Sequence, residues 1–366
     1  MMAAADDGRF MRRALALATE GWGRVHPNPL VGAVVVRDGE VVGEGAHREF
    51  GGPHAEVEAL RAAGERARGA TLYVTLEPCA HHGKTPPCTD AVRAAGIRRL
   101  VYAVADPHQD ARGGARVLAE SGVLVEGGVE EAAARRQNAL FLVPLERGRP
   151  FVALKYGMSL DARLGRQGER TPVTGRAAQE EAHRLRAGFD AVLVGGRTAR
   201  VDDPRLTVRH GPPPRVPPTR VVVDTAGDLP EGGHLVRTAR ETPVVLVTGP
   251  DPDASRLQRL EDAGVQVVKA PGAAGQVDLT ATLAVLAGRG ITTIFCEGGG
   301  RLGAGLLAAD LVDRVYLFTA PRVLGSGTVP AFPEDAFPAG PPVARFRVSD
   351  ARVVGADALL VLDRSD

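Results

Sequence analysis

The pattern of hydrophobic and polar positions predicts an α/β arrangement in the first part of the chain. Apolar runs of strand length alternate there with amphipathic stretches of helix length. The expected elements are, in order, a helix at 10–20, a hairpin at 30–43 with an Asp-Gly turn, a helix opened by Pro53, a strand at 71–76, a helix opened by Pro78, a strand at 100–105 and a helix at 113–121. Because the strand runs are almost wholly apolar, we expect an α/β sandwich with a largely buried sheet.

A second sheet is predicted in the remainder of the chain. The strand-like runs are 151–156, 190–196, 220–224, 244–248 and 291–296, with helical patterns between them. The proline-rich stretch 212–218 cannot enter a central strand, so it is expected on the surface. The polar, proline-bounded run 143–150 is typical of a linker. The predicted domains are therefore 1–147 and 148–366.

Composition narrows the classes of function. The 366 residues suit two domains, and 45 Lys+Arg against 44 Asp+Glu leave no general basic field for nucleic acid. Three cysteines argue against a disulfide scaffold and for a reducing compartment. Neither a signal-peptide pattern nor a run of about 20 apolar residues is present, so we expect a soluble, cytoplasmic protein.

One histidine and two cysteines form the main candidate chemical site. His54, Cys79 and Cys88 can hold a zinc ion and leave its fourth position open, which is typical of catalytic zinc. Glu56, two residues after the histidine, can move a proton between water and a leaving amine. The pattern H-x-E followed by P-C is found in zinc deaminases of nucleobases, although here eight residues separate the two cysteines.

A structural zinc site is the alternative interpretation of the same residues. His81 or His82 would then complete a closed four-ligand site, but Glu56 would have no role. His26 and Asn28 are also open to two interpretations, as residues of a stiff loop or as residues on the rim of a substrate pocket.

A glycine-rich segment follows the last strand of the second sheet. The sequence Glu297-Gly298-Gly299-Gly300-Arg301 and its continuation to Leu307 predict a turn and then a helix. Such a turn can present backbone N–H groups to a phosphate, but it can equally be an ordinary tight turn.

Several of these motifs resemble the bifunctional deaminase–reductase family of riboflavin biosynthesis. In the first domain they are His26-Pro27-Asn28-Pro29, Val31-Gly32-Ala33, His54-Ala55-Glu56-Val57 and the whole run from Thr75 to Cys88 with its His-His-Gly-Lys-Thr-Pro-Pro spacer. The resemblance implies a cytidine-deaminase-like α/β/α sandwich in which His54, Cys79 and Cys88 bind Zn²⁺ and Glu56 carries the proton.

The resemblance extends through the second domain, to nearly the whole chain. It is carried by 155–161, 202–209 and 297–299, which look like the family's reductase domain, similar in fold to dihydrofolate reductase. It implies that NADPH is bound by Gly157, Thr198, Asp202, Thr225, Gly299, Gly300, Arg301, Leu302, Gly303, Ala304 and Gly305. It implies that the substrate is bound by Arg170, Arg186, Leu206, Arg209 and Glu297. The match is looser at 161–174, where Ala162 replaces a glycine and the family's Trp is missing.

The resemblance implies two reactions on one small molecule. The first domain would deaminate 2,5-diamino-6-ribosylamino-4(3H)-pyrimidinone 5′-phosphate, and the second would reduce its ribosyl group to ribityl with NADPH. A nucleic-acid deaminase, a deaminase with a feeble reductase and a zinc-stabilised binding module are the rival interpretations. No nucleic-acid or membrane partner is expected, and self-association into a homo-oligomer stays open.

Overall fold

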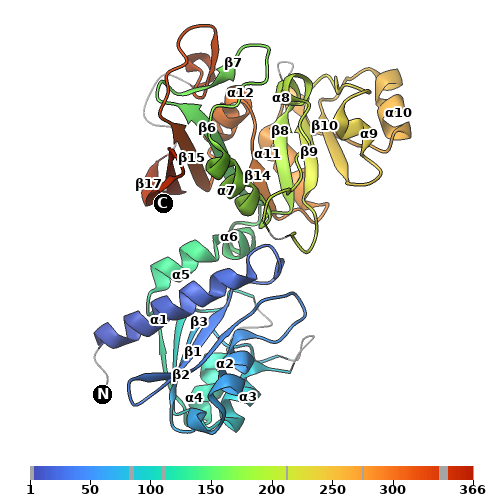
Figure 1. Ribbon diagram of the computed structural model, residues 1–366. Helices are drawn as coiled ribbons and strands as arrows, with labels where there is room; N and C mark the ends of the chain where they lie inside the picture. The colour runs from blue at the N-terminus through green and yellow to red at the C-terminus, as the bar shows by residue number, and fades with distance from the viewer. Residues whose placement is uncertain are drawn as a thin grey trace. The chain divides into compact units, whose positions relative to one another are not determined.

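The chain folds into two compact units, Met1–Gly148 and Arg149–Asp366 (Figure 1). The computed structural model describes residues 4–81, 86–108, 113–211, 213–273, 276–337 and 345–365. The division falls one residue after the domain boundary expected from the sequence. Among the described residues, no helix is both long enough and apolar enough to cross a membrane.

The first unit is a sheet with helices on both faces. Its strands lie in the order β2-β1-β3-β4-β5, with β1 antiparallel to β2 and β3, and with β3, β4 and β5 parallel. The strands are β1 Gly32–Arg37, β2 Glu40–Ala46, β3 Thr71–Leu76, β4 Arg99–Val104 and β5 Leu124–Gly127. The helices are α1 Ala4–Ala18, α2 Ala55–Ala63, α3 Cys88–Ala94, α4 Gly114–Glu120, α5 Glu131–Gln137 and α6 Ala139–Arg147. Helices α1 and α5 cover one face, and α2, α3 and α4 cover the other (Figure 1).

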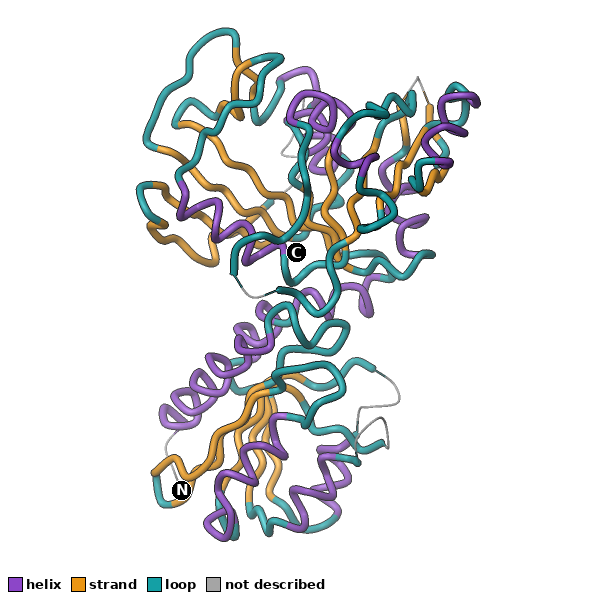
Figure 2. Tube along the Cα trace, turned by 45° about the vertical axis from the view of Figure 1, so that its right-hand side comes forward, coloured by secondary structure: helices purple, strands orange, loops and turns teal. Residues whose placement is uncertain are grey.

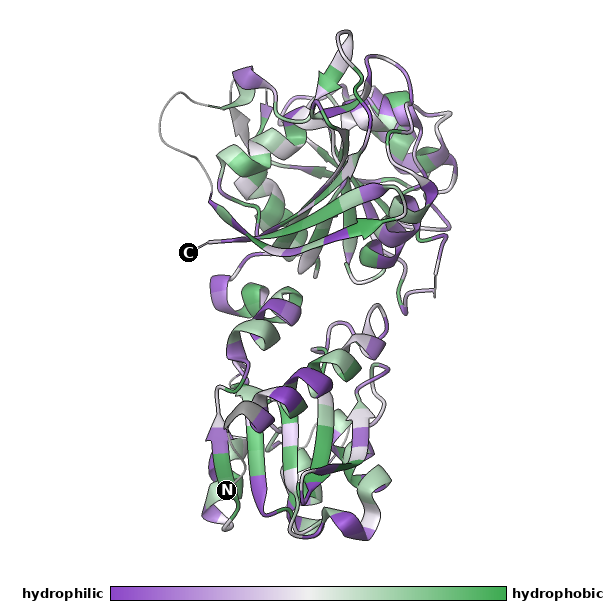
Figure 3. Ribbon diagram, turned by 60° about the vertical axis from the view of Figure 1, so that its left-hand side comes forward, coloured by the Kyte–Doolittle hydropathy of each residue, from purple (hydrophilic) through white to green (hydrophobic). Residues whose placement is uncertain are grey.

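The central strands of the first unit are apolar because their side chains are buried in its core. Every residue of β3 is buried, and the buried side chains of β1, β3 and β4 belong to one cluster with those of α1 and α2. Figure 3 shows these strands largely in the hydrophobic colour. The predicted sandwich is confirmed.

Two local predictions in this unit are wrong. No helix begins at Pro78, because the described residues after β3 form a loop and α3 begins only at Cys88. The run 143–147 is not a linker but the end of α6, which contains Pro144 in its interior. Burial of Leu140 and Leu142 stabilises that helix, and Gly148, at a φ of 64°, ends it.

The second unit contains a larger mixed sheet. Within the described residues its nine strands have the order β11-β10-β9-β8-β14-β6-β15-β18-β17, parallel from β11 to β15, with β18 antiparallel to both of its neighbours. The strands are β6 Phe151–Ser159, β8 Ala191–Gly195, β9 Thr219–Val223, β10 Val244–Thr248, β11 Gln266–Lys269, β14 Thr293–Cys296, β15 Arg314–Ala320, β17 Phe346–Val354 and β18 Asp357–Arg364. Short pairs are formed by β7 Arg163–Arg166 with β16 Thr328–Pro330, and by β12 Gly272–Ala273 with β13 Gln276–Val277.

Helices cover this sheet on two faces as well (Figure 2). They are α7 Arg176–Arg186, α8 Gly196–Asp202, α9 His234–Arg237, α10 Ala254–Asp262, α11 Leu279–Ala287 and α12 Gly300–Ala308. Alternate residues of β10 belong to different cores: Val245 and Val247 pack with α11 and α12, while Val244 and Leu246 pack with α9 and α10. The predicted surface position of 213–218 holds for most of these residues, and Pro212 lies outside the described residues.

Candidate active sites

The candidate metal ligands come from segments that meet at one edge of the first sheet. Cys79 follows β3, and Asp106 follows the neighbouring parallel strand β4, so both lie beyond the carboxyl ends of their strands. Asn28 precedes β1 in the sequence. Because β1 is antiparallel to β3, the start of β1 lies beside the end of β3, and Asn28 is therefore at the same edge. His47 follows β2, whose Ala46 pairs with Gly32 at the start of β1.

His54, Cys79 and Cys88 are brought together as the sequence predicts. Their ligand atoms all lie within 4.8 Å of one another, and His54 Nδ1 is 3.1 Å from Cys88 Sγ and 3.7 Å from Cys79 Sγ. A tetrahedral zinc ion separates such atoms by about 3.5–3.8 Å. The distance from His54 to Cys79 lies in this range, and Cys88 is close enough to join them after a small outward shift, so the residue types and their closeness fit zinc. His81 lines the same cavity but lies outside this ligand group, and His82 lies outside the described residues.

The electrostatics of the group also favour a cation. The pKa of Cys79 is held well below its usual range, because its sulfur accepts hydrogen bonds from Cys88 and His54. The pKa of Cys88 is raised by the same contact with Cys79 and by burial. Two adjacent thiols cannot both ionise without a positive charge between them, and zinc supplies that charge.

Glu56 lies in the first turn of α2, two residues after His54, which is the N-cap of that helix. Its side chain is buried, and burial raises the pKa of its carboxyl. A carboxyl group with a raised pKa in a cavity can both accept and donate a proton near neutral pH, as acid–base catalysis of deamination requires.

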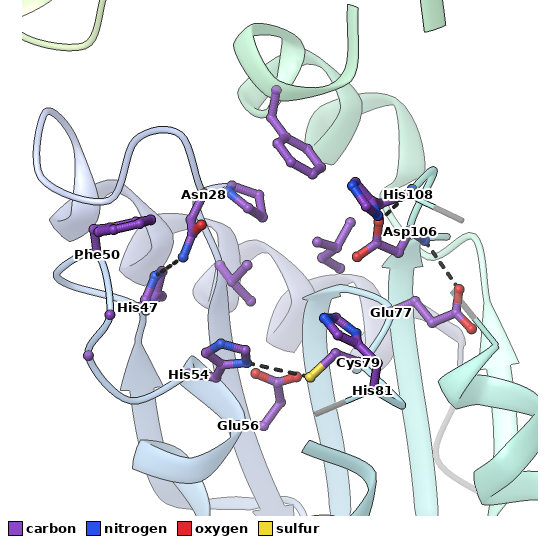
Figure 4. A pocket seen from close by; sticks show the side chains of 16 residues that line it. Asn28, His47, Phe50, His54, Glu56, Glu77, Cys79, His81, Asp106 and His108 are labelled. Atoms are coloured by element: carbon purple, nitrogen blue, oxygen red, sulfur yellow. Dashed lines mark hydrogen bonds between the residues drawn. The ribbon is translucent and has the colours of Figure 1, made fainter. Parts of the chain in front are cut away.

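A cavity of about 310 Å³ opens above these residues (Figure 4). His47 Nδ1 donates to the Pro53 carbonyl oxygen at 3.0 Å, and His47 Nε2 accepts from Asn28 Nδ2 at 3.1 Å. Burial lowers the pKa of His47, which favours this neutral form of the ring. Asn28 therefore lines the cavity with its amide oriented, while His26 lies outside the lining.

Glu77 accepts hydrogen bonds from three backbone N–H groups on the opposite side of the cavity. Its Oε1 accepts from the backbone N–H groups of Gly113 and Ala115 at 3.0 Å, and its Oε2 accepts from Asp106 N–H at 3.2 Å. Asp106 is buried and lines the cavity, and burial raises the pKa of its carboxyl. Glu77 thus joins the ends of β3 and β4 to the start of α4.

In the second unit, buried Arg186 forms an ion pair with half-buried Glu297. Arg186 Nε and Nη2 lie 2.8 and 2.6 Å from Glu297 Oε1, and Arg186 also donates to the Thr207 carbonyl oxygen. Burial opposes ionisation of Glu297, but Arg186 and Lys155 outweigh it and hold the pKa of its carboxyl below its usual range. Burial also lowers the pKa of Lys155, which lies over the Phe318 ring.

Other cations gather beside this pair. Desolvation by the surrounding protein and the guanidinium groups of Arg186, Arg205 and Arg170 lower the pKa of Arg209. Leu206 is buried in the same loop. The structure therefore brings the five predicted substrate residues into one neighbourhood, where clustered guanidinium groups can bind a phosphate.

The predicted cofactor residues lie on several elements. Thr198 is in the first turn of α8 and approaches Gly299, Asp202 ends α8, and Thr225 follows β9 and accepts from Val277 N–H at 3.2 Å. Gly157 lies on β6 beside Thr174.

The glycine-rich segment forms a turn and then a helix, as predicted, but the helix includes most of the residues 299–305 that were expected to form a turn. Helix α12 begins at Gly300, so only the residues before it form the turn, with Gly299 as the N-cap. A Cβ at Gly300 would meet Pro330 O at 2.2 Å, and one at Gly303 would meet Tyr156 Oη at 2.0 Å. Close packing therefore accounts for these two glycines. Arg301 is exposed and pairs with Asp335, Leu302 is half-buried beside Gly298, Ala304 is buried, and Gly305 lies near Leu279.

Sequence reasoning missed several residues at the two sites. Asp106, which immediately follows an apolar strand, and Lys155, a charge inside one, both carried a local signal. His183 also carried a local signal in the sequence, because it lies three residues before Arg186 and so on the same helix face. His47 has none, since only the pairing of β2 with β1 brings it to the cavity.

Two protein-family models match the chain in succession. The model of the cytidine and deoxycytidylate deaminase zinc-binding region matches residues 4–104, and the model of the RibD C-terminal domain matches residues 150–360. The second match alone spans more than half of the chain.

Relatives and solved structures match over nearly the whole length. The riboflavin biosynthesis protein RibD of Escherichia coli is 38% identical over 97% of this chain and 99% of its own, and that of Aquifex aeolicus is 40% identical over 88% of each. A structure of Acinetobacter baumannii RibD has a TM-score of 0.84 at 35% identity and covers 100% of both chains. A Thermotoga maritima deaminase/reductase structure has a TM-score of 0.81 at 32% identity and covers 99% of both.

Proposed function

Because the chain belongs to the RibD family of riboflavin biosynthesis proteins, we propose that its two units deaminate and then reduce one pyrimidine ribosylamine phosphate. The chain is a bifunctional enzyme with a zinc-binding deaminase domain and an NADPH-dependent reductase domain. The proposed substrate is 2,5-diamino-6-ribosylamino-4(3H)-pyrimidinone 5′-phosphate, and the proposed domains are 1–147 and 148–366.

The proposed deaminase site consists of His54, Cys79 and Cys88 as zinc ligands and Glu56 as the proton carrier. Zinc, when bound there, makes water a nucleophile at neutral pH. Glu56 takes a proton from the attacking water and delivers it to the ring 2-amino group, which leaves as ammonia.

The proposed reductase site is divided between substrate and cofactor. NADPH, when bound beside Gly157, Thr198, Asp202, Thr225 and the segment 299–305, supplies the hydride that converts the ribosyl group to ribityl. Arg186, held by Glu297, and Arg209 and Arg170 surround the substrate, and their guanidinium groups suit its 5′-phosphate. Buried Leu206 supplies an apolar contact.

The observation that carries the proposal is the placement of Glu56 beside three residues that fit zinc, in a chain that matches RibD proteins along its length. The test is turnover of the diamino substrate by the zinc-loaded chain. Without NADPH we expect ammonia release, and with NADPH added to the deaminated product we expect NADPH oxidation. Absence of ammonia would refute the deaminase, and absence of NADPH oxidation with the deaminated product would refute the reductase.

We also propose a cytoplasmic location, no nucleic-acid partner and self-association into a homo-oligomer. The small number of cysteines, three in 366 residues, supports the first proposal, and the balance of 45 basic against 44 acidic residues supports the second. The exposed edge strand β17, with Val348 60% and Val353 77% exposed, supports the third. Cell fractionation, an RNA-binding assay and light scattering test them in turn.

A further inference from the structure

Two side chains on one face of α7 hold the backbone of the loop 203–211. His183 Nδ1 accepts a hydrogen bond from the Arg209 N–H at 3.1 Å. One helical turn further on, Arg186 donates to the Thr207 carbonyl oxygen. This loop carries Arg209 and Leu206, two of the residues proposed to bind the substrate. The helix therefore fixes the loop at two backbone groups only two residues apart in sequence.

The conformation of the loop shows why it needs such support. Leu206 has a φ of 53° and Asp203 a φ of 39°, a left-handed region that residues with a side chain seldom adopt. Strained backbone of this kind persists where surrounding contacts hold it in place. Asp203 Oδ1 accepts from His234 N–H at the start of the loop, and His183 holds its end.

We propose that His183 is a positioning residue for the reduction, since its bond to the Arg209 N–H fixes Arg209 and Leu206 where they meet the substrate. The inference rests on the proposed reductase function. It assigns His183 no contact with the substrate, because its side chain is 95% buried and its acceptor nitrogen is engaged by the loop backbone.

The environment of His183 keeps its ring in the form that accepts. The charged and titratable groups around it are Arg186, Arg209, Glu297 and His210, whose ring lies edge-on at a centroid distance of 4.8 Å. Burial and the two neighbouring arginines lower the pKa of His183 to about 4. Near neutral pH the ring is therefore uncharged, with its proton on Nε2 and its lone pair on Nδ1.

Two substitutions of His183 distinguish the effect of this hydrogen bond from the effect of side-chain packing. His183→Leu fills the site but cannot accept, whereas His183→Asn places a side-chain oxygen near the position of Nδ1. The measurement uses the zinc-loaded full-length chain and the deaminated substrate. We expect His183→Leu to raise the reductase KM for that substrate about three- to tenfold, because one hydrogen bond is lost. We expect kcat and the KM for NADPH to change less than about twofold, because the lost contact serves substrate binding.

His183→Asn should restore a KM close to that of the unsubstituted chain. Hydrogen exchange measured by mass spectrometry on peptides covering 204–211 should be faster in His183→Leu and unchanged in His183→Asn. Ammonia release by the deaminase domain is the internal control for both variants.

Equal KM increases in the two variants, or no increase in His183→Leu, would overturn the inference and leave the reductase function standing. If the unsubstituted chain fails to oxidise NADPH with the deaminated substrate, the reductase function falls and the inference falls with it.

Discussion

At the scale of single residues, the role of Glu56 can be tested separately from that of the proposed zinc ligands by changing one functional group. Glu56→Gln keeps the size and polarity of the side chain but cannot carry a proton. We expect deamination to fall by about 10²–10⁴-fold, the usual contribution of acid–base catalysis, with the zinc content unchanged. Ammonia release and elemental analysis on the same sample measure the two quantities.

Glu58 provides the matched control, because it lies on the same helix, pairs with Arg61 and is absent from the cavity lining. Glu58→Gln should leave deamination unchanged, whereas Cys88→Ser should lower the zinc content. Near-normal ammonia release by Glu56→Gln would contradict the assigned role.

Arg209 permits a second test at this scale. If its guanidinium group binds the substrate phosphate, Arg209→Ala loses a charged hydrogen bond worth about 1.5–3 kcal/mol. We expect the kcat/KM of reduction to fall about 10- to 100-fold, with deamination unaffected. Steady-state NADPH oxidation measures the effect. Arg347→Ala, at an exposed position of β17, is the control, and an equal loss in both variants would point away from a phosphate contact.

At the scale of elements, Asp7 joins α1 to two strands of the first sheet. Its carboxylate accepts from Tyr73 Oη on β3 at 2.5 Å and from both terminal nitrogens of Arg99 on β4 at 2.8 Å. Only 4% of the residue is exposed. The hydrogen bonds from Arg99 hold the pKa of Asp7 below its usual range. Asp7→Asn should therefore lower the free energy of unfolding of this unit at pH 7 by about 1–3 kcal/mol.

The pH dependence of this loss has a defined sign. Because the folded pKa of Asp7 is depressed, its contribution to stability is present above the unfolded value of about 3.9 and disappears as the pH falls through the folded value. The difference between Asp7→Asn and the unsubstituted chain should shrink in that range. Fluorescence of Trp22, the chain's single tryptophan, reports unfolding of the unit that contains it. Asp6→Asn is the control, and a difference independent of pH would contradict the account.

At the scale of the whole molecule, the first unit should function alone. Fragment 1–148 contains its own sheet, its own core and all of the candidate zinc ligands. We expect it to bind zinc and to release ammonia without NADPH. If the fragment folds and binds zinc but does not release ammonia, the hypothesis that the deaminase site works without the second unit is contradicted.

A shorter fragment shows where the unit ends. Fragment 1–138 lacks α6, and with it the buried Leu142 and Phe141, which lines the deaminase cavity. We expect a lower melting temperature and weaker deamination than for fragment 1–148. Equal behaviour of the two fragments would show that α6 does not belong to the deaminase unit.

The sequence by itself determined the sandwich, the nature of the zinc group and five strands of the second sheet, whereas β11, β15, β17 and β18 were not predicted. Apolar runs of four to eight residues bounded by turn residues are typical of internal strands, which is why β3 and most of the parallel strands were predictable. His54 and Glu56 were predictable for another reason, because a helix start fixes two residues of one short segment relative to each other. The chemistry of one histidine, two cysteines and one carboxylate then indicated zinc catalysis.

Only the tertiary structure decided what depends on distant partners. Pro144 favours a break in the chain, but the burial of Leu140 and Leu142 makes the segment helical. By sequence alone Gly300 and Gly303 could belong to a turn, but they lie in α12, at positions where a Cβ would collide with Pro330 O and Tyr156 Oη. The position of His47 follows from the pairing of β2 with β1, and no local pattern contains that information. For His183 the helix pattern predicts only that it shares a face with Arg186, and its bond to the Arg209 N–H depends on the fold of the loop after α8.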